Sequence, residues 1–300
     1  MMPRDDEYRR MGGSVCSYSR GEAVRAWRVD ATLLALPAAV FLLIWFLLPL
    51  LRFFALAFDG AGGPMATFEA LVLSPVYARV FVNTLLVAAT VTAFTLVLAW
   101  PVAYLLSRLS GFIFFLVLYC VVFPIWISVL VRTFSWMLLL ERNGPINRTL
   151  IDIGVISQPL PLLFNATGEM IGMVHVMLPY AILPLYAAMS RIDRRLLLAS
   201  DGLGAGLFDT FRYVYFPLSL PGLLGGATFV FVLSLGFYIT PALLGGANAV
   251  TLSMLIASFI SERLAWDLAS AASIVLLAIT LILLAICARF VPLGEQVGVK

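Results

Sequence analysis

The stretch Leu196–Gly226, LLLASDGLGAGLFDTFRYVYFPLSLPGLLGG, is polar and rich in glycine, although the 300-residue chain around it is 62% hydrophobic. Seven charged residues lie between Ser190 and Pro217: Arg191, Asp193, Arg194, Arg195, Asp201, Asp209 and Arg212. Seven charges buried in lipid would cost roughly 20 kcal/mol on the insertion scale, at about 2.5–3.5 kcal/mol each. We therefore expect this stretch outside the bilayer, joining two spanning helices.

The rest of the chain is apolar enough to cross a membrane several times. Its mean hydropathy is +1.04, and only 12% of its residues are charged. A helix needs about 20 apolar residues to cross the hydrocarbon core. Six segments meet this length: 31–51, 80–106, 113–138, 169–189, 218–241 and 267–288. The sequence thus predicts an all-α integral membrane protein with six transmembrane helices. In the third, we expect Pro124 to cause a kink and Arg132 to snorkel to the interface from the far end.

The basic residues indicate the orientation of the chain. Six spans place both termini and the polar stretch on one side of the membrane. That side carries thirteen of the nineteen basic residues: Arg4, Arg9, Arg10, Arg20, Arg25, Arg28, Arg108, Arg191, Arg194, Arg195, Arg212, Arg289 and Lys300. The positive-inside rule then places both termini in the cytoplasm. Because a polar segment precedes the first apolar run, we expect 1–30 to be a cytoplasmic tail and 31–51 a retained helix, not a cleaved signal peptide.

Several residue types that carry chemistry are scarce. The only lysine is Lys300 at the C-terminal end, which excludes a G-x-x-x-x-G-K-[ST] phosphate loop. The only histidine, His175, excludes multi-histidine zinc sites and is expected to be a hydrogen-bonded packing residue inside the bundle. The three cysteines are far apart and lack metal-ligand spacing. We therefore expect no catalytic site, no metal site and no cofactor on this chain.

The polar stretch has the pattern of a helix–glycine–helix elbow. Glycines at 202, 204 and 206 separate two segments with helical periodicity, and Phe208, Phe211 and Tyr215 recur on one face of the second. Pro217 is expected to end that helix, and Pro221-Gly222 to open the next span. The residues alone leave two interpretations open. The aromatic side chains either rest among lipid headgroups or form a docking knob for a cytosolic partner.

A motif in this stretch points to one of them. Two patterns, A-[AS]-x-x-L-G-A and F-x-x-V-x-x-P-x-x-x-P-G, are met by Ala199, Ser200, Asp201, Gly202, Leu203, Gly204 and Ala205, then by Phe211, Val214, Pro217, Pro221 and Gly222. This resembles the coupling loop of permease subunits of binding-protein-dependent ABC importers. The resemblance implies a type I permease fold and a coupling helix seated in a groove of a separate ATPase. The family's leading glutamate is replaced by Leu198, and we hypothesise that Asp201, one helical turn on, takes over its contact.

The resemblance extends from about Asn83 to Arg289 and gives a domain organisation. It implies a core domain over 80–289 with five transmembrane helices and a coupling loop over 190–217. The segments FPIWISVLVRTFSWMLLL, NGPIN and GFYITPALLGG are similar to spermidine/putrescine-type permeases. Permeases for phosphonate, opine and iron share parts of them and stay open as alternatives. The coupling-loop residues implied are Ala199, Ser200, Asp201, Gly204, Ala205, Phe208, Phe211 and Pro217.

The resemblance also implies location and partners. It places the chain in the bacterial inner membrane, without enzymatic activity of its own, and with ATP and Mg²⁺ on a cytosolic ATPase dimer. A second permease subunit, expected to be a paralogue, and an extracytoplasmic solute-binding protein complete the importer, and no nucleic acid is involved. A self-sufficient secondary transporter is the competing class. Such a transporter usually needs an ionisable group embedded in the membrane, and the predicted spans contain few ionisable residues.

The solute path is less legible. Aromatic side chains with carboxylates suit an organic ammonium solute through Coulomb attraction and cation–π contact. The candidates are Trp136, Glu141, Glu169, Tyr180, Phe237 and Tyr238. The alternative is that the aromatics belong to the interfacial belt found at span ends and that Glu141 is a solvated loop residue.

Overall fold

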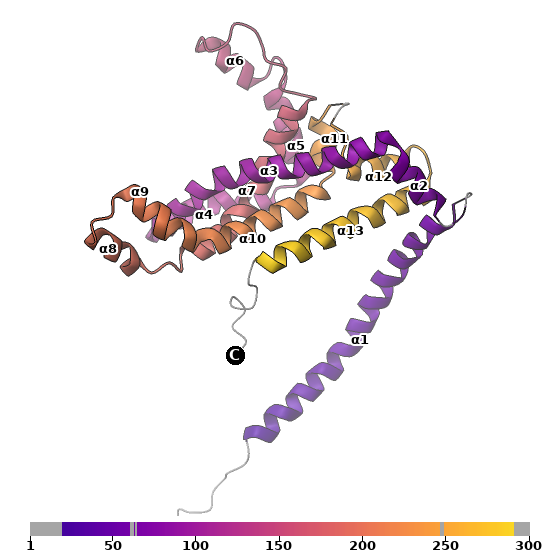
Figure 1. Ribbon diagram of the computed structural model, residues 1–300, viewed down its shortest axis with the longest axis horizontal. Helices are drawn as coiled ribbons and strands as arrows, with labels where there is room; N and C mark the ends of the chain where they lie inside the picture. The colour runs from indigo at the N-terminus through magenta and orange to yellow at the C-terminus, as the bar shows by residue number, and fades with distance from the viewer. Residues whose placement is uncertain (1–19, 61–62, 64, 247–248, 291–300) are drawn as a thin grey trace, which may run out of the picture. The chain divides into compact units, whose positions relative to one another are not determined.

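The computed structural model describes residues 20–60, 63, 65–246 and 249–290, and every regular element among them is a helix (Figure 1). Contacts divide the chain into two units, residues 1–53 and 54–300. In the described residues, five helices are long and apolar enough to cross a membrane, or six if one bent pair counts as one span. The prediction of an all-helical membrane protein is confirmed.

The first unit contains one long helix. Helix α1 runs from Arg20 to Ala55, and its apolar span is Leu36–Phe58. The helix therefore begins about ten residues before the predicted span. Residues 20–30 contain alanine, glutamate and arginine, which favour helix and allow the spanning helix to continue into its polar flank. Within this unit, the apolar side chains from Leu36 to Leu48 are exposed.

Three long helices make the core of the second unit. Helices α3 (Pro75–Arg108), α7 (Ala166–Met189) and α10 (Phe216–Leu235) contact one another, and the core residues Val91, Met177 and Val230 are almost fully buried. Figure 1 shows α3, α7 and α10 running side by side. Gly222 allows α10 to pack closely against α7, because a methyl group at this position would lie 2.4 Å from Cβ of Ala188. Other elements of this unit are η1 (Leu56–Phe58), α2 (Ala66–Leu73), α6 (Pro145–Asp152), α12 (Leu252–Ser261) and α13 (Trp266–Phe290).

The third predicted span is not one helix. Helix α4 covers Gly111–Trp126 and α5 covers Val129–Leu140, and the chain bends by 102° between them. Ile127 and Ser128 have ψ of 133° and 134°, outside the helical region, so α4 ends at Trp126, two residues after Pro124. The expectation of a simple kink in a continuous helix over 113–138 was wrong. The helix is interrupted because two residues leave the helical region of backbone space.

The fifth predicted span also differs from the structure. Helix α9 (Leu207–Thr210), the π-helical turn η2 (Phe211–Tyr215) and α10 follow one another without a break, so Pro217 does not end a helix. A π turn carries an extra residue per turn, which accommodates a proline that has no N–H to donate. At its other end α10 stops at Gly236, short of the predicted 241, and a separate helix α11 (Ile239–Leu244) follows.

The chain between α11 and α13 packs on the helix bundle. It forms the short helix α12, whose residues Leu252, Leu255 and Phe259 are buried. Phe259 packs edge-on against Tyr77 of α3 at 5.7 Å between ring centroids, and α12 also contacts α13.

Candidate functional site

The polar stretch forms the predicted elbow, here defined as residues 193–215. Its first helix, α8 (Arg194–Gly202), is capped by Asp193, whose carboxylate accepts a hydrogen bond from the backbone N–H of Arg195 at 2.9 Å. The turn after α8 needs a left-handed residue, and Gly204 supplies it with a φ of 81°. A hydrogen bond between the hydroxyls of Ser200 and Thr210, 2.9 Å apart, closes α8 against α9.

The elbow exposes apolar side chains that a soluble surface rarely leaves uncovered. Leu203 is 89% exposed and Leu207 91%, and Phe208 is also exposed. Among the other predicted coupling residues, Ala199, Asp201, Gly204 and Pro217 are exposed, Phe211 is at the margin of exposure, Ala205 is half-buried and Ser200 is buried. Neighbouring exposed apolar side chains on one turn are typical of a protein interaction site.

The predicted aromatic face divides into two parts. Phe208 points outward, whereas Phe211 and Tyr215 pack on the end of α3. The rings of Trp100 and Phe211 are edge-on with centroids 5.0 Å apart, and Tyr104 meets Tyr215 at 5.2 Å. We call these four aromatic residues the clasp.

Two further contacts close the clasp. Its hydroxyl end is tied by a 3.2 Å hydrogen bond between Tyr215 and Ser107, and the Arg108 guanidinium lies over the Tyr104 ring at 5.2 Å. Edge-on aromatic pairs add stability beyond their buried area, so the clasp fastens the elbow to α3.

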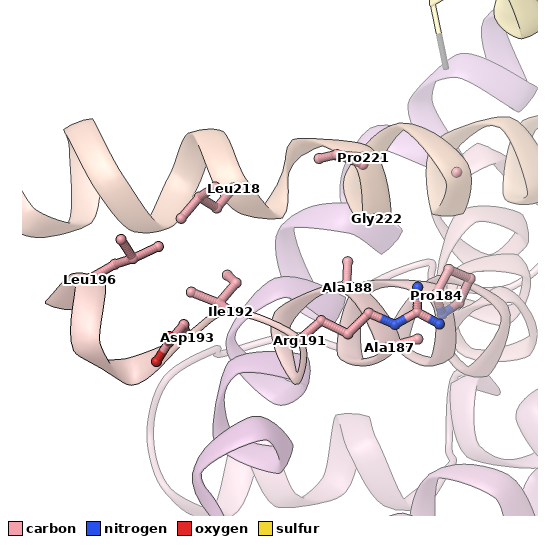
Figure 2. Close-up of a pocket in the computed structure, with 11 residues that line it drawn as sticks. Pro184, Ala187, Ala188, Arg191, Ile192, Asp193, Leu196, Leu218, Pro221 and Gly222 are labelled. Atoms are coloured by element: carbon pink, nitrogen blue, oxygen red, sulfur yellow. The ribbon is translucent and has the colours of Figure 1, made fainter. Parts of the chain in front are cut away.

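Two cavities flank the elbow. One, of about 570 Å³, lies beside the clasp, and both Leu198 and Asp201 line it. The other, of about 470 Å³, lies between the elbow and the ends of α7 and α10. Figure 2 shows Leu196 of α8 and Leu218 of α10 on its two sides, with Ala188 on α7. The elbow is thus attached on one side and has open space on two others.

The position of Asp201 bears on the hypothesis that it replaces the missing glutamate. Its side chain is exposed and accepts a long hydrogen bond of 3.5 Å from the Thr210 hydroxyl. Leu198 is 68% exposed and borders the same cavity. The two side chains therefore belong to one surface of the elbow, although Asp201 is partly engaged within the chain.

The candidate solute residues do not form one cluster. The Trp136 indole donates to Nδ1 of His175 at 3.1 Å, which confirms the expected hydrogen-bonded histidine, and the Tyr180 ring contacts Phe229. The Phe237 carbonyl accepts a hydrogen bond from the Ser253 hydroxyl. The remaining three differ in burial: Glu141 and Tyr238 are exposed, while Glu169 is 1% exposed and neither of its carboxylate oxygens has a hydrogen-bond partner.

One polar residue was placed wrongly from the sequence. Arg132, expected to snorkel to the interface, is only 6% exposed, and its Nη2 donates to the carbonyl of Ile127 at 3.3 Å. The bend before α5 turns its first helical turn inward, where Thr133 pairs with Thr240 of α11 at 3.1 Å. A lone arginine within an apolar run was the available signal, since ionisable residues inside membrane segments usually have a function.

The described residues contain no group of three or more His, Cys, Asp or Glu side chains placed to hold a metal ion. Polar side-chain contacts join α5 to α7 through Trp136 and His175, and α5 to α11 through Thr133 and Thr240.

Comparisons with known proteins agree with this arrangement. Residues 86–292 match the family model described as binding-protein-dependent transport system inner membrane component. The spermidine/putrescine transport system permease protein PotB of Haemophilus influenzae is 35% identical over 201 residues, which cover 67% of this chain and 70% of that protein. The residues matched by the family model include the clasp, the elbow and the broken span.

Solved structures show the same fold. A chain of a bacterial alginate ABC transporter, in complex with an alginate pentasaccharide-bound periplasmic protein, superposes with a TM-score of 0.70 at 19% identity, covering 89% of this chain and 95% of that one. A chain of the MetNI methionine ABC transporter, in an inward-facing conformation, gives a TM-score of 0.53 at 19% identity, covering 73% and 98%.

Proposed function

Because the chain belongs to the family of binding-protein-dependent transport system inner membrane components, we propose that it is the permease subunit of an ATP-driven importer that moves a polyamine, such as putrescine or spermidine, into the cytoplasm. The observation that carries the solute is the 35% identity to a spermidine/putrescine permease over two thirds of the chain. The observation that carries ATP coupling is the elbow with its exposed leucines.

The elbow surface fits a groove on a cytosolic ATPase dimer. Leu203, Leu207 and Phe208 would enter it, and burying each would contribute roughly 1.5–3 kcal/mol of transfer free energy before the costs of association. ATP and Mg²⁺ would bind to that partner, since this chain lacks a phosphate loop. The basic residues of the elbow favour a cytoplasmic position, and with it cytoplasmic termini.

The remaining parts of the importer follow from the same proposal. One permease chain supplies half of a pathway, so a second permease, which we expect to be a paralogue, would face α5, α7 and α11. An extracytoplasmic binding protein would deliver the solute. Along the path we propose contacts from Trp136, Tyr180, Phe237 and Tyr238, with Glu141 and Glu169 as carboxylates for the ammonium groups.

Charge substitution on the elbow tests the coupling. Leu207→Glu changes a side chain that is 91% exposed, so the fold is retained while the apolar contact is lost. Ile153→Glu, at an exposed position after α6, is the matched control. We expect pull-down of the co-encoded ATPase to fail for Leu207→Glu and to succeed for the control. Equal capture of the ATPase by both variants would contradict the coupling assignment.

Uptake into membrane vesicles tests the solute. The assay uses the co-encoded ATPase and binding protein, with labelled putrescine and spermidine, with and without ATP. ATP-dependent uptake of either polyamine supports the proposal. Stimulation of ATPase activity by the loaded binding protein without polyamine uptake keeps the importer and rejects the solute. Uptake that needs no ATPase rejects the importer.

The role of Asp201 has its own test. If Asp201 replaces the family glutamate, Asp201→Ala should weaken assembly with the ATPase, and the double variant Leu198→Glu/Asp201→Ala should restore it. Asp209→Ala, an exposed acid on the neighbouring α9, is the control. Unchanged assembly and transport for Asp201→Ala would reject the substitution hypothesis.

A further inference from the structure

The break between α4 and α5 places a helix N-terminus inside a spanning segment. Helix α5 is twelve residues long, and its N-cap residue, Ser128, makes no side-chain capping hydrogen bond. The first N–H groups of any helix have no partner within it and carry the positive end of the helix dipole. Irregular backbone at membrane depth is tolerated where protein or a polar ligand satisfies it.

Arg132 adds a second, independent feature at the same place. It lies in the first turn of α5, and its hydrogen bond to the Ile127 carbonyl folds the guanidinium back onto the break. Only 6% of the Arg132 surface is exposed, yet its Nε and Nη1 have no hydrogen-bond partner among the described residues. A buried guanidinium with free donors is costly unless an anion pairs with it.

Among the described residues, no acidic side chain forms an ion pair with Arg132. The hydroxyl of Thr133, the next residue along the chain, is already paired with the Thr240 hydroxyl and with the Val129 carbonyl. His175 accepts the Trp136 indole N–H at Nδ1, so a neutral His175 carries its proton on Nε2, as one more donor.

We propose that the break between α4 and α5 is an anion-binding site, in which the free N–H groups of Arg132 and the N-terminal amides of α5 bind a carboxylate or phosphate group. A guanidinium presents parallel donors that match two oxygens of such an anion, and a helix N-terminus adds further N–H groups. The anion comes either from solution or from a larger solute. The site does not depend on the transported solute being a polyamine.

Thermal unfolding of the purified full chain in detergent tests the site. Wild-type protein is titrated with sodium phosphate, sodium acetate and 4-aminobutanoate, at an ionic strength held constant with a bulky sulfonate salt. We expect a saturable rise in the unfolding midpoint, of about 5 °C at one hundred times the dissociation constant. Arg132→Gln should abolish the rise, Arg132→Lys should reduce it, and Arg142→Gln, at an exposed position, should leave it intact.

The three anions separate the two sources. Stabilisation by phosphate or acetate supports a free anion, and stabilisation by 4-aminobutanoate alone supports a carboxylate carried by a solute. No saturable response in the wild-type protein overturns the site, and this outcome needs no folded variant. An equal response in wild type and Arg132→Gln also overturns it. Polyamine uptake is a separate assay, so its failure does not affect this result.

Discussion

Replacing Gly204 by alanine should uncouple the elbow without disturbing the bundle. Gly204 has a φ of 81°, and a methyl group built on it meets no atom within 4 Å. The cost is therefore conformational and not steric, at about 1–2 kcal/mol for an L-residue held in the left-handed region. At about 1.4 kcal/mol per factor of ten, that energy corresponds to a roughly 5- to 30-fold weaker affinity for an ATPase that requires the bent elbow.

The assay is the dissociation constant of the ATPase from the chain in lipid nanodiscs. Gly202→Ala is the matched control, because Gly202 also has open space around it and no positive φ. Gly204→Asn should fall between the two, since asparagine enters the left-handed region at a lower cost. Wild-type affinity for Gly204→Ala, or equal weakening for Gly202→Ala, would show that the elbow's conformation does not control docking.

Three further substitutions test the packing that supports the elbow and the loop after α5. Gly222→Ala should lower stability by about 1–3 kcal/mol, because the new methyl would lie 2.4 Å from Ala188 Cβ and 3.0 Å from the Pro184 carbonyl oxygen. Gly225→Ala, whose methyl would meet no atom within 4 Å, should leave the thermal unfolding midpoint unchanged. Asn147→Leu should lower stability by about 1–3 kcal/mol, because the Leu160 N–H loses the Asn147 side-chain oxygen to which it donates at 3.0 Å. The measurement is proteolysis of the loop 153–165, which should become faster, and Thr149→Val is the control. Asp193→Ala should cost about 0.5–2 kcal/mol in the stability of α8, seen as faster amide exchange there, whereas Asp193→Asn should not.

The spans that the sequence predicted well are those in which length and apolarity leave one solution. A run such as that of α7 can only be a helix in lipid, because its backbone must bond within itself. This argument failed for the third span, because Pro124 indicates that the helix is distorted but not where it is interrupted. The break falls at Ile127 and Ser128, whose extended backbone depends on how α5 packs against α7 and α11.

The elbow was predictable as a segment but not in its side-chain contacts. Its charges, glycines and motif gave its limits, whereas the different exposure of Phe208 and Phe211 depends on which ring meets α3. Trp100 and Tyr104, which contact Phe211 and Tyr215, come from a helix distant in the sequence, so local periodicity could not show which ring is covered. Arg132 was misplaced for a similar reason, because snorkelling assumes a straight helix whose end lies at the interface.

Helix α7 gives the elbow a direct mechanical connection to the broken span. Its 24 residues extend for about 36 Å. Asp193, which caps the elbow helix α8, lies four residues after the C-terminal end of α7. At the N-terminal end of α7, Asn165 donates its backbone N–H to the Leu244 carbonyl of α11. Between these ends, His175 accepts the hydrogen bond from Trp136 of α5. Because close-packed interiors transmit strain, we expect a displacement of the elbow that reaches α7 to shift α5 and α11 with it or to break these bonds.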